Sequence, residues 1–390
     1  MNARERLNKI LKFQRDVDRG SVQETFIPWE LTVERWINEG LPTELVENLW
    51  KPKGVNLTWT DQFMRWFWAD GVYNYEQYFG LDGLKRLFFG IPLSGFDNKI
   101  IEETEDYEQT QNFDGSHVKT DKKSGVKTKV KQPVESAEDW YKIKASTQKF
   151  IEKHFTDENI QRIFMPFRER HQKGEYSIMM EIKGFFDTPR NLFGIENHLY
   201  AFYDFPEIMH EINEFLIEFY FNKLGNVLDF LPVDVLYIVE DLSGKNGSMI
   251  SPKHFDEFIG AYYKRLVPFL KEHGVHHIFV DTDGDFTGLI PNFLEVGIEG
   301  FLPLDVNAGV DVVELRKNYP NVKLIGGFNK LCISKGKNAI DSEFERLLPV
   351  IRQGGYIPGV DHQVAPSTSL EYYLYYIERL RQIMMDVYSS

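Results

Sequence analysis

Two short elements in the second half of the chain end in residues that could carry acid–base or metal chemistry. Ile278–Val280 leads into Asp281 and Asp283, and Tyr356–Val360 leads into Asp361 and His362. Asp281 and Asp283 are two residues apart, so on one strand they would face the same side. With His362 they could bind a divalent metal ion such as zinc. Alternatively, one carboxyl could keep its proton beside its neighbour and act as an acid, or Asp283-Gly284-Asp285 could be a turn that caps a helix.

Other predicted strands also end in polar residues, and a single one of them says little, because Asp and Asn are common caps and turn residues. Their coincidence over five strand ends favours one shared site. The candidates from these ends, beyond those above, are Glu240 as a catalytic group and Lys245, Asn246, Asp305, Asn329 and Lys330 as substrate-binding groups. Two further candidates are Arg190, which could clamp a carboxylate or pair with Asp187 or Glu196, and Trp29, which could line a pocket.

The elements that must position these groups alternate between strands and helices. The predicted strands are 176–182, 235–240, 278–281, 300–303, 323–325 and 356–358, and the predicted helices are 205–224, 252–272, 287–296, 339–353 and 369–388. This βαβα order indicates a parallel sheet, either open or closed into a barrel.

The first third of the chain has a different character. Residues 1–95 are aromatic-rich and irregular, with a predicted helix near 3–18 and a possible strand at 24–27. The segment Trp59–Trp68 could be a buried helix or a pocket wall. Residues 96–132 alternate polar and apolar positions between Asp-Gly and Ser-Gly turns, which predicts a β-meander inserted into a single domain spanning 1–390.

Composition excludes several functions. The 390 residues carry a formal net charge of -14 and 42% hydrophobic residues, which argues against nucleic-acid binding and against disorder. With one cysteine, Cys332, no internal disulfide can form. There is no GxGxxG or GK[ST] motif, so we expect no nucleotide cofactor. No apolar signal core or long apolar run is present, so we expect no membrane contact and a cytoplasmic location.

At these residues the chain resembles the uroporphyrinogen decarboxylase superfamily, closely over about 175–386 and loosely before that. The resemblance is carried by five segments: Glu240-Asp241 with Lys245-Asn246-Gly247 and Ile250-Ser251-Pro252, Val280–Asp285, Val306–Asp311, Ile325–Lys330 and Gly354–Pro358. It implies a (β/α)₈ TIM barrel with its site at the strand C-termini. It also implies a decarboxylase, or a methyltransferase that moves methyl groups to or from a corrinoid protein or a thiol.

The departures from the family pattern narrow this expectation. The Arg-rich substrate loop of the decarboxylases is absent near the N-terminus, and Phe63-Met64-Arg65-Trp66 matches it only superficially. Uroporphyrinogen itself is therefore not expected as substrate. The zinc methyltransferases of the family use a His-x-Cys pair and a later Cys, and Asp281, Asp283 and His362 occupy those positions here.

The leading hypothesis is therefore transfer of a methyl group from a small methoxylated or methylated substrate to a corrinoid carried by a partner protein. Asp281, Asp283 and His362 would hold a metal or a proton for the leaving group. The alternatives are a decarboxylase for another carboxylate, clamped by Arg190, Lys245 or Lys330, and a non-catalytic barrel that binds a partner. The resemblance also makes a homodimer plausible.

Overall fold

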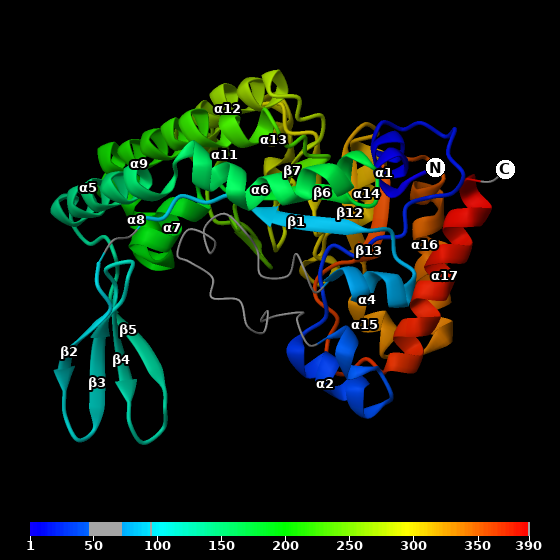
Figure 1. Ribbon diagram of the computed structural model, residues 1–390, viewed down its shortest axis with the longest axis horizontal. Coiled ribbons are helices and arrows are strands. Elements are labelled where there is room, and N and C mark those ends of the chain that lie inside the picture. Colours follow the sequence, from blue (N-terminus) through cyan, green and yellow to red (C-terminus); the bar gives the residue numbers. More distant parts are fainter. Residues whose placement is uncertain (47–71, 94–95, 389–390) are drawn as a thin grey trace.

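The computed structural model describes residues 1–46, 72–93 and 96–388, and its centre is a parallel sheet of seven strands (Figure 1). In spatial order the strands are β1 (Leu84–Phe88), β6 (Ser177–Lys183), β7 (Val235–Val239), β10 (Ile278–Asp281), β11 (Gly300–Leu302), β12 (Lys323–Phe328) and β13 (Tyr356–Val360). Each strand pairs with the next in parallel register, as in a (β/α) barrel. The predicted TIM-barrel fold is confirmed.

An N-terminal segment lies where an eighth strand would close the barrel. The carbonyl of Val22 accepts a hydrogen bond from the amide of Asp82, just before β1, at 2.7 Å. The Glu24 carboxylate accepts one from the amide of Val360, at the end of β13, at 3.1 Å. Residues 22–24 therefore join the two ends of the sheet, although no strand forms at the predicted 24–27.

Helices follow the strands and cover the outside of the barrel. They are α5 (Ala137–His154), α6 (Asp157–Gln172), α7 (Asp187–Phe193), α8 (Ile195–Asp204), α9 (Pro206–Phe219), α10 (Gly225–Leu228), α11 (Pro252–Phe255), α12 (Ala261–Glu272), α13 (Ile290–Glu295), α14 (Val312–Asn318), α15 (Lys330–Ile333), α16 (Lys337–Ile351) and α17 (Leu370–Tyr388). Short π-helical turns at 220–224 and 256–260 interrupt two of the predicted long helices. Within the described part of the chain, no helix is long and apolar enough to cross a membrane.

The N-terminal third differs from its prediction. The first helix, α1 (Ala3–Leu11), is half as long as expected, and α2 (Glu30–Asn38) and α4 (Val72–Phe79) follow it. Strand β1 lies inside the region that was predicted to be irregular. It was missed because Lys85 and Arg86 interrupt its apolar pattern, although Lys85 is buried and Arg86 forms hydrogen bonds within the fold. The segment Trp59–Trp68, which includes the partial match to the substrate loop at Phe63–Trp66, lies outside the described residues.

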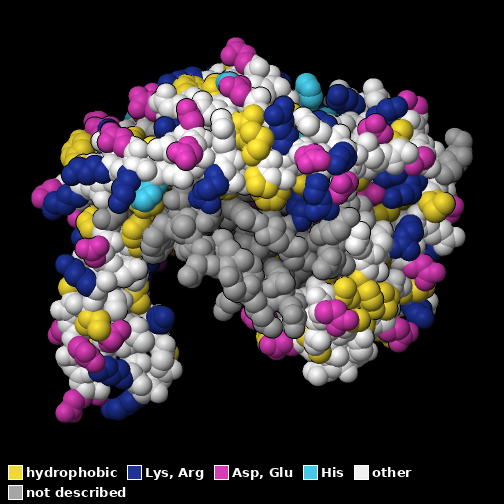
Figure 2. Space-filling model, viewed as in Figure 1, with side chains coloured by type: hydrophobic (Ala, Val, Ile, Leu, Met, Phe, Trp, Pro, Cys, Tyr) yellow, Lys and Arg dark blue, Asp and Glu magenta, His cyan; other side chains and the backbone are white. Residues whose placement is uncertain are grey.

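The predicted meander forms a separate antiparallel sheet. Its strands are β2 (Lys99–Glu103), β3 (Tyr107–Gln111), β4 (His117–Asp121) and β5 (Lys127–Lys131), in sequence order. Figure 1 shows this sheet, here called the arm, projecting from the barrel below α7 and α8. The space-filling view shows the arm projecting from one end of the molecule (Figure 2).

Candidate functional site

The candidate site lies in the loops at the carboxyl ends of β7, β10 and β13. Strands β7 and β10 pair with Val239 opposite Asp281, so the residues two positions later, Asp241 and Asp283, also lie side by side. The amide of Asp283 approaches the Asp241 carboxylate at 3.5 Å. Parallel strands bring their carboxyl ends to one mouth, which is why residues far apart in the sequence meet here.

Asp283 and His362 meet across this mouth. His362 Nε2 lies 3.8 Å from Asp283 Oδ2, and the side chains are 29% and 49% exposed, respectively. The imidazole stacks on Phe26, with ring centroids 5.1 Å apart, and Trp29 lies beside it at 6.2 Å. The structure thus brings together three predicted site residues, Asp283, His362 and Trp29, and adds Phe26.

A positive φ of 79° at Gly284 keeps Asp283 in this place. A Cβ atom at Gly284 would lie 2.6 Å from the carbonyl oxygen of Ser243, in the loop after β7. Only glycine adopts this turn without strain or a clash. The loops after β7 and β10 can therefore pack closely, and Asp283 is held at the mouth.

Burial and neighbouring charges at the mouth raise the pKa of two carboxyls and lower the pKa of the imidazole. Burial, together with the charges of Asp241 and Asp305, raises the pKa of Asp283 to about 6. Burial and the carboxylates of Glu181, Asp241 and Asp283 raise the pKa of Asp281 well above its ordinary value. Burial and the Lys330 ammonium lower the pKa of His362. Burial therefore disfavours the charged form of all three side chains.

Asp361, the neighbour of His362, is fully buried and links three loops. Its carboxylate accepts hydrogen bonds from the amide of Lys330 and from the side chain of Asn307, each at 3.0 Å. The Lys330 ammonium also lies 3.5 Å from it. Asp361 thereby ties the loops after β11 and β12 to β13 and fixes the backbone that carries His362.

Glu240 does not fit its predicted catalytic role. It is 0% exposed, and its carboxylate accepts hydrogen bonds from three backbone amides at 2.7–3.2 Å and from the Tyr263 hydroxyl at 2.6 Å. The amides belong to Phe185, Phe186 and Asp187, at the start of α7. Burial raises the pKa of Glu240 to about 7 although these hydrogen bonds oppose the shift. The side chain supports the turn between β6 and α7, and its carboxylate has no contact with solvent.

Asp305 and Asn329, predicted to bind substrate, both cap short helical turns. Asp305 Oδ1 accepts from the amide of Asn307 at 3.1 Å, and Asn329 Oδ1 accepts from the amide of Leu331 at 3.0 Å. Asp305 still lies near enough to Asp283 to raise the pKa of that group. Asn329 has the structural role that its sequence position also allowed.

The cationic residues predicted to bind substrate are either paired with carboxylates of this chain or exposed on a turn. Arg190 donates to the carboxylates of Asp187 and Asp241 at 3.1 and 3.2 Å, and Lys330 is paired with Asp361. Lys245 and Asn246 form the exposed turn of a small hairpin between β8 (Ser243–Gly244) and β9 (Gly247–Ser248). In the described chain, no hydrogen bond or ion pair links these two residues to Asp283 or His362.

Sequence reasoning missed a polar network inside the barrel. Arg86 donates to the Tyr237 hydroxyl at 2.9 Å, and that hydroxyl donates to Glu181 at 2.8 Å. Lys183 continues the network, 3.3 Å from Glu181 and 3.8 Å from Asp187. One signal was available, because Glu181 is a lone carboxylate in the apolar run Ser177–Ile182. A charge in such a run requires partners, which the neighbouring strands supply.

The metal predicted at Asp281, Asp283 and His362 does not fit this arrangement. Within the described ranges, no three His, Cys, Asp or Glu side chains are grouped so that they could hold a metal ion.

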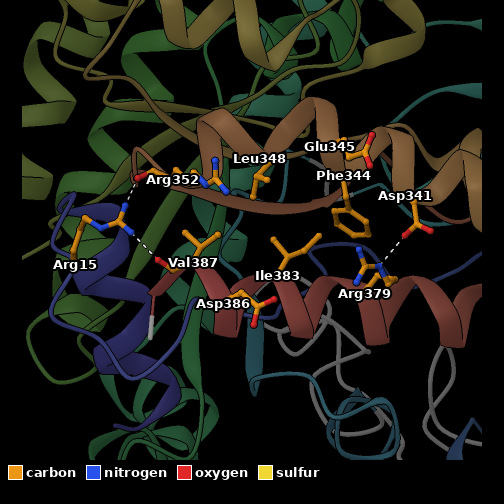
Figure 3. A pocket seen from close by; sticks show the side chains of 10 residues that line it. All are labelled: Arg15, Asp341, Phe344, Glu345, Leu348, Arg352, Arg379, Ile383, Asp386 and Val387. Atoms are coloured by element: carbon orange, nitrogen blue, oxygen red, sulfur yellow. Dashed lines mark hydrogen bonds and ion pairs between the residues drawn. The ribbon is translucent and has the colours of Figure 1, made fainter. Parts of the chain in front are cut away.

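A cavity of about 480 Å³ elsewhere in the molecule is not this site (Figure 3). It lies between α16 and α17, with Phe344, Leu348 and Ile383 as its apolar floor and arginine and acidic side chains at its rim. No residue from the loops after β7, β10 or β13 lines it.

Comparison with known proteins places the described geometry in a family. A family model described as uroporphyrinogen decarboxylase (URO-D) matches residues 114–383, more than half of the chain. No curated protein matches. Among solved structures, a methyltransferase from Methanosarcina mazei is similar with a TM-score of 0.58 and 14% identity, covering 98% of both chains.

A second solved structure, from Listeria monocytogenes and described as a vitamin-B12-independent methionine synthase, has a TM-score of 0.39 and 12% identity. The alignment covers 94% of this chain and 97% of that one. At these identities, the likeness to the Methanosarcina mazei structure establishes the barrel fold and nothing finer.

Proposed function

The chain belongs to the uroporphyrinogen decarboxylase family, and from this premise we propose that it is a methyltransferase. Its substrate would be a small methoxylated or methylated compound, and the acceptor would be a corrinoid carried by a partner protein. The similar structure from Methanosarcina mazei is described as a methyltransferase, which motivates this choice of reaction. The observation that carries the proposal is the Asp283–His362 pair at the barrel mouth.

The reaction needs a proton donor at the leaving atom. When a methyl group leaves an ether, the C–O bond breaks, its electron pair stays on oxygen, and an unprotonated alkoxide or phenoxide leaves poorly. With a pKa of about 6, Asp283 keeps its proton in about a tenth of the molecules at pH 7. Its half-exposed carboxyl can therefore protonate the leaving oxygen as the bond breaks.

His362 can restore the acid after each turnover. Its lowered pKa keeps the imidazole neutral near pH 7, so it can take a proton from water and pass it to the Asp283 carboxylate. Phe26 and Trp29 hold the ring on one side and supply an apolar wall against which a methoxylated compound could pack. The corrinoid would supply the nucleophile that accepts the methyl group.

The charges of the site favour methyl transfer over decarboxylation. A decarboxylase that clamps its substrate's carboxylate needs an available cation. Arg190 and Lys330 are already paired with carboxylates of this chain, and Lys245 lies on an exposed turn. A substrate carboxylate entering this mouth would also meet Asp241, Asp283 and Asp305, whose charges repel it.

The test is a transfer assay with free cob(I)alamin as acceptor and 2-methoxyphenol as donor. Methylcobalamin formation is followed by absorbance, and released CO₂ is measured with added carboxylates. We expect transfer by the wild-type protein and a loss of about 10²- to 10⁴-fold in Asp283→Asn, with Lys245→Ala as the control that keeps activity. Undiminished transfer in Asp283→Asn, or CO₂ release without transfer, would overturn the proposal.

A further inference from the structure

The ring of Phe26 contacts side chains from both ends of the seven-stranded sheet. It stacks on the imidazole of His362, which follows β13, with ring centroids 5.1 Å apart and an interplanar angle of 16°. The guanidinium of Arg86, on β1, lies 5.0 Å from the centroid of the same ring. A cation over an aromatic face is attracted to it. Phe26 therefore connects Arg86 with His362 across the closure of the barrel.

Arg86 also holds the backbone that carries Phe26. One of its nitrogens donates a hydrogen bond to the carbonyl of Thr25, the preceding residue. Another donates to the Tyr237 hydroxyl at 2.9 Å, and that hydroxyl donates to Glu181 at 2.8 Å. The neighbouring strands thus fix the guanidinium, which in turn fixes the Phe26 segment. A planar guanidinium can make these contacts together, which a single ammonium nitrogen cannot.

The orientation of His362 depends on ring contacts. Within the described residues, no hydrogen bond to the protein restrains the imidazole, and Asp283 Oδ2 lies 3.8 Å from its Nε2. The ring of Trp29 is farther away than that of Phe26, with its centroid at 6.2 Å, and the Trp29 side chain is exposed. The stacked ring of Phe26 is therefore the main restraint on the direction in which the imidazole points.

We propose that Arg86 is a positioning residue of the candidate site, because it fixes the His362 imidazole beside Asp283 by holding Phe26. Its contacts with the Thr25 carbonyl and the Phe26 ring set the place of the ring, and the ring sets the place of the imidazole. The effect of Arg86 on the transfer rate rests on the proposed function. Its effect on the orientation of His362 does not.

The test is NMR spectroscopy of the full chain with isotope-labelled histidine. The ring-proton signal of His362 is identified by its absence in His362→Gln. A phenyl ring stacked on an imidazole displaces such a signal, and Phe26→Leu defines the position without this displacement. We expect Arg86→Lys, which keeps the charge but lacks the planar guanidinium, to lose at least about half of the displacement. An unmoved signal in Arg86→Lys would overturn the proposal.

Arg316→Lys is the matched control. Arg316 is also buried, donates to the carbonyls of Pro320 and Gly355 at 2.6 and 3.2 Å, and lies 5.1 Å from the centroid of the Phe13 ring. Gly355 directly precedes β13, so these contacts lie at the opposite end of the barrel. The His362 signal should stay in place in Arg316→Lys. A shift as large as that in Arg86→Lys would overturn the proposal.

Two further variants test the route through Phe26. If Arg86 acts through this ring, the signal in the double variant Arg86→Lys/Phe26→Leu should match that in Phe26→Leu alone. Tyr237→Phe keeps Arg86 but removes one of its partners, and it should move the signal in the same direction by a smaller amount. If circular dichroism shows that Arg86→Lys is unfolded, Tyr237→Phe decides, and an unmoved signal there would overturn the proposal.

The transfer rate separates this inference from the proposed function. Arg86→Lys should lower kcat by about tenfold with little change in KM, because a misdirected imidazole returns protons to Asp283 more slowly. A moved signal with an unchanged kcat would uphold the positioning role of Arg86 and overturn the proton transfer assigned to His362. A moved signal in a protein that transfers no methyl group would overturn the proposed function alone.

Discussion

Glu240 and Asp283 are carboxylates that follow neighbouring strands, and the barrel gives them opposite environments. Glu240 is completely buried and accepts four hydrogen bonds, whereas Asp283 is half exposed and its carboxylate meets only His362, at 3.8 Å, among the described side chains. Both pKa values are raised by burial. The comparison teaches that a perturbed carboxyl at a strand end marks chemistry only where its oxygens remain free to meet a substrate.

The largest effect on stability should come from removing the buried carboxylate of Glu240. Glu240→Ala leaves three buried amides and the Tyr263 hydroxyl without their acceptor. We expect the free energy of unfolding to fall by about 3–5 kcal/mol, measured by urea denaturation. Asp283→Asn should show no comparable loss, because no hydrogen bond to its carboxylate is removed in the described structure. Equal destabilisation of both variants would contradict the distinction.

The half-exposed carboxylate of Asp283 should instead depend on His362 for its activity in methyl transfer. His362→Gln removes the group that returns a proton to Asp283, and we expect the rate of methyl transfer to fall by about 10²-fold while the fold is kept. His276→Gln is the matched control, because His276 is exposed and precedes β10 at the opposite end of the barrel. A loss that is equal in both variants would remove His362 from the mechanism.

The pH dependence of the rate should report Asp283. The acid acts when protonated, so transfer should decline as the pH rises through about 6. Asp241→Asn removes a neighbouring negative charge, which lowers the pKa of Asp283. The decline should then begin at a lower pH, whereas Asp256→Asn, an exposed carboxylate on the helical layer, should leave it in place. An unmoved profile in Asp241→Asn would mean that another group is the acid.

The smallest effect is expected at the exposed hairpin. Lys245→Ala and Asn246→Ala should each change the transfer rate by no more than about twofold, because both side chains lie on an exposed turn. A tenfold loss in either variant would show that the hairpin takes part in substrate binding, as the sequence had suggested.

The sequence by itself determined the alternation of strands and helices from β6 onward, and the family resemblance added the closed barrel. Its apolar runs alternate with amphipathic segments, and local periodicity is enough to predict such elements. It also placed Asp283 and His362 at strand ends, where the order of the sheet brings them to one mouth. It missed β1 and the Arg86–Tyr237–Glu181 network, because a charge inside a strand is explained only by partners on other strands.

Only the tertiary structure decided which polar side chains at the strand ends stay accessible to a substrate and which are buried in hydrogen bonds. Glu240 and Asp283 look alike in the sequence, since each is a carboxylate within two residues of another one and follows an apolar run. Their difference depends on the turn before α7, which supplies three amides to Glu240, and on Phe26 and Trp29, which approach His362 from more than 300 residues away along the chain. Hydrogen bonds and burial between distant segments are properties of the packed chain, and no local pattern contains them.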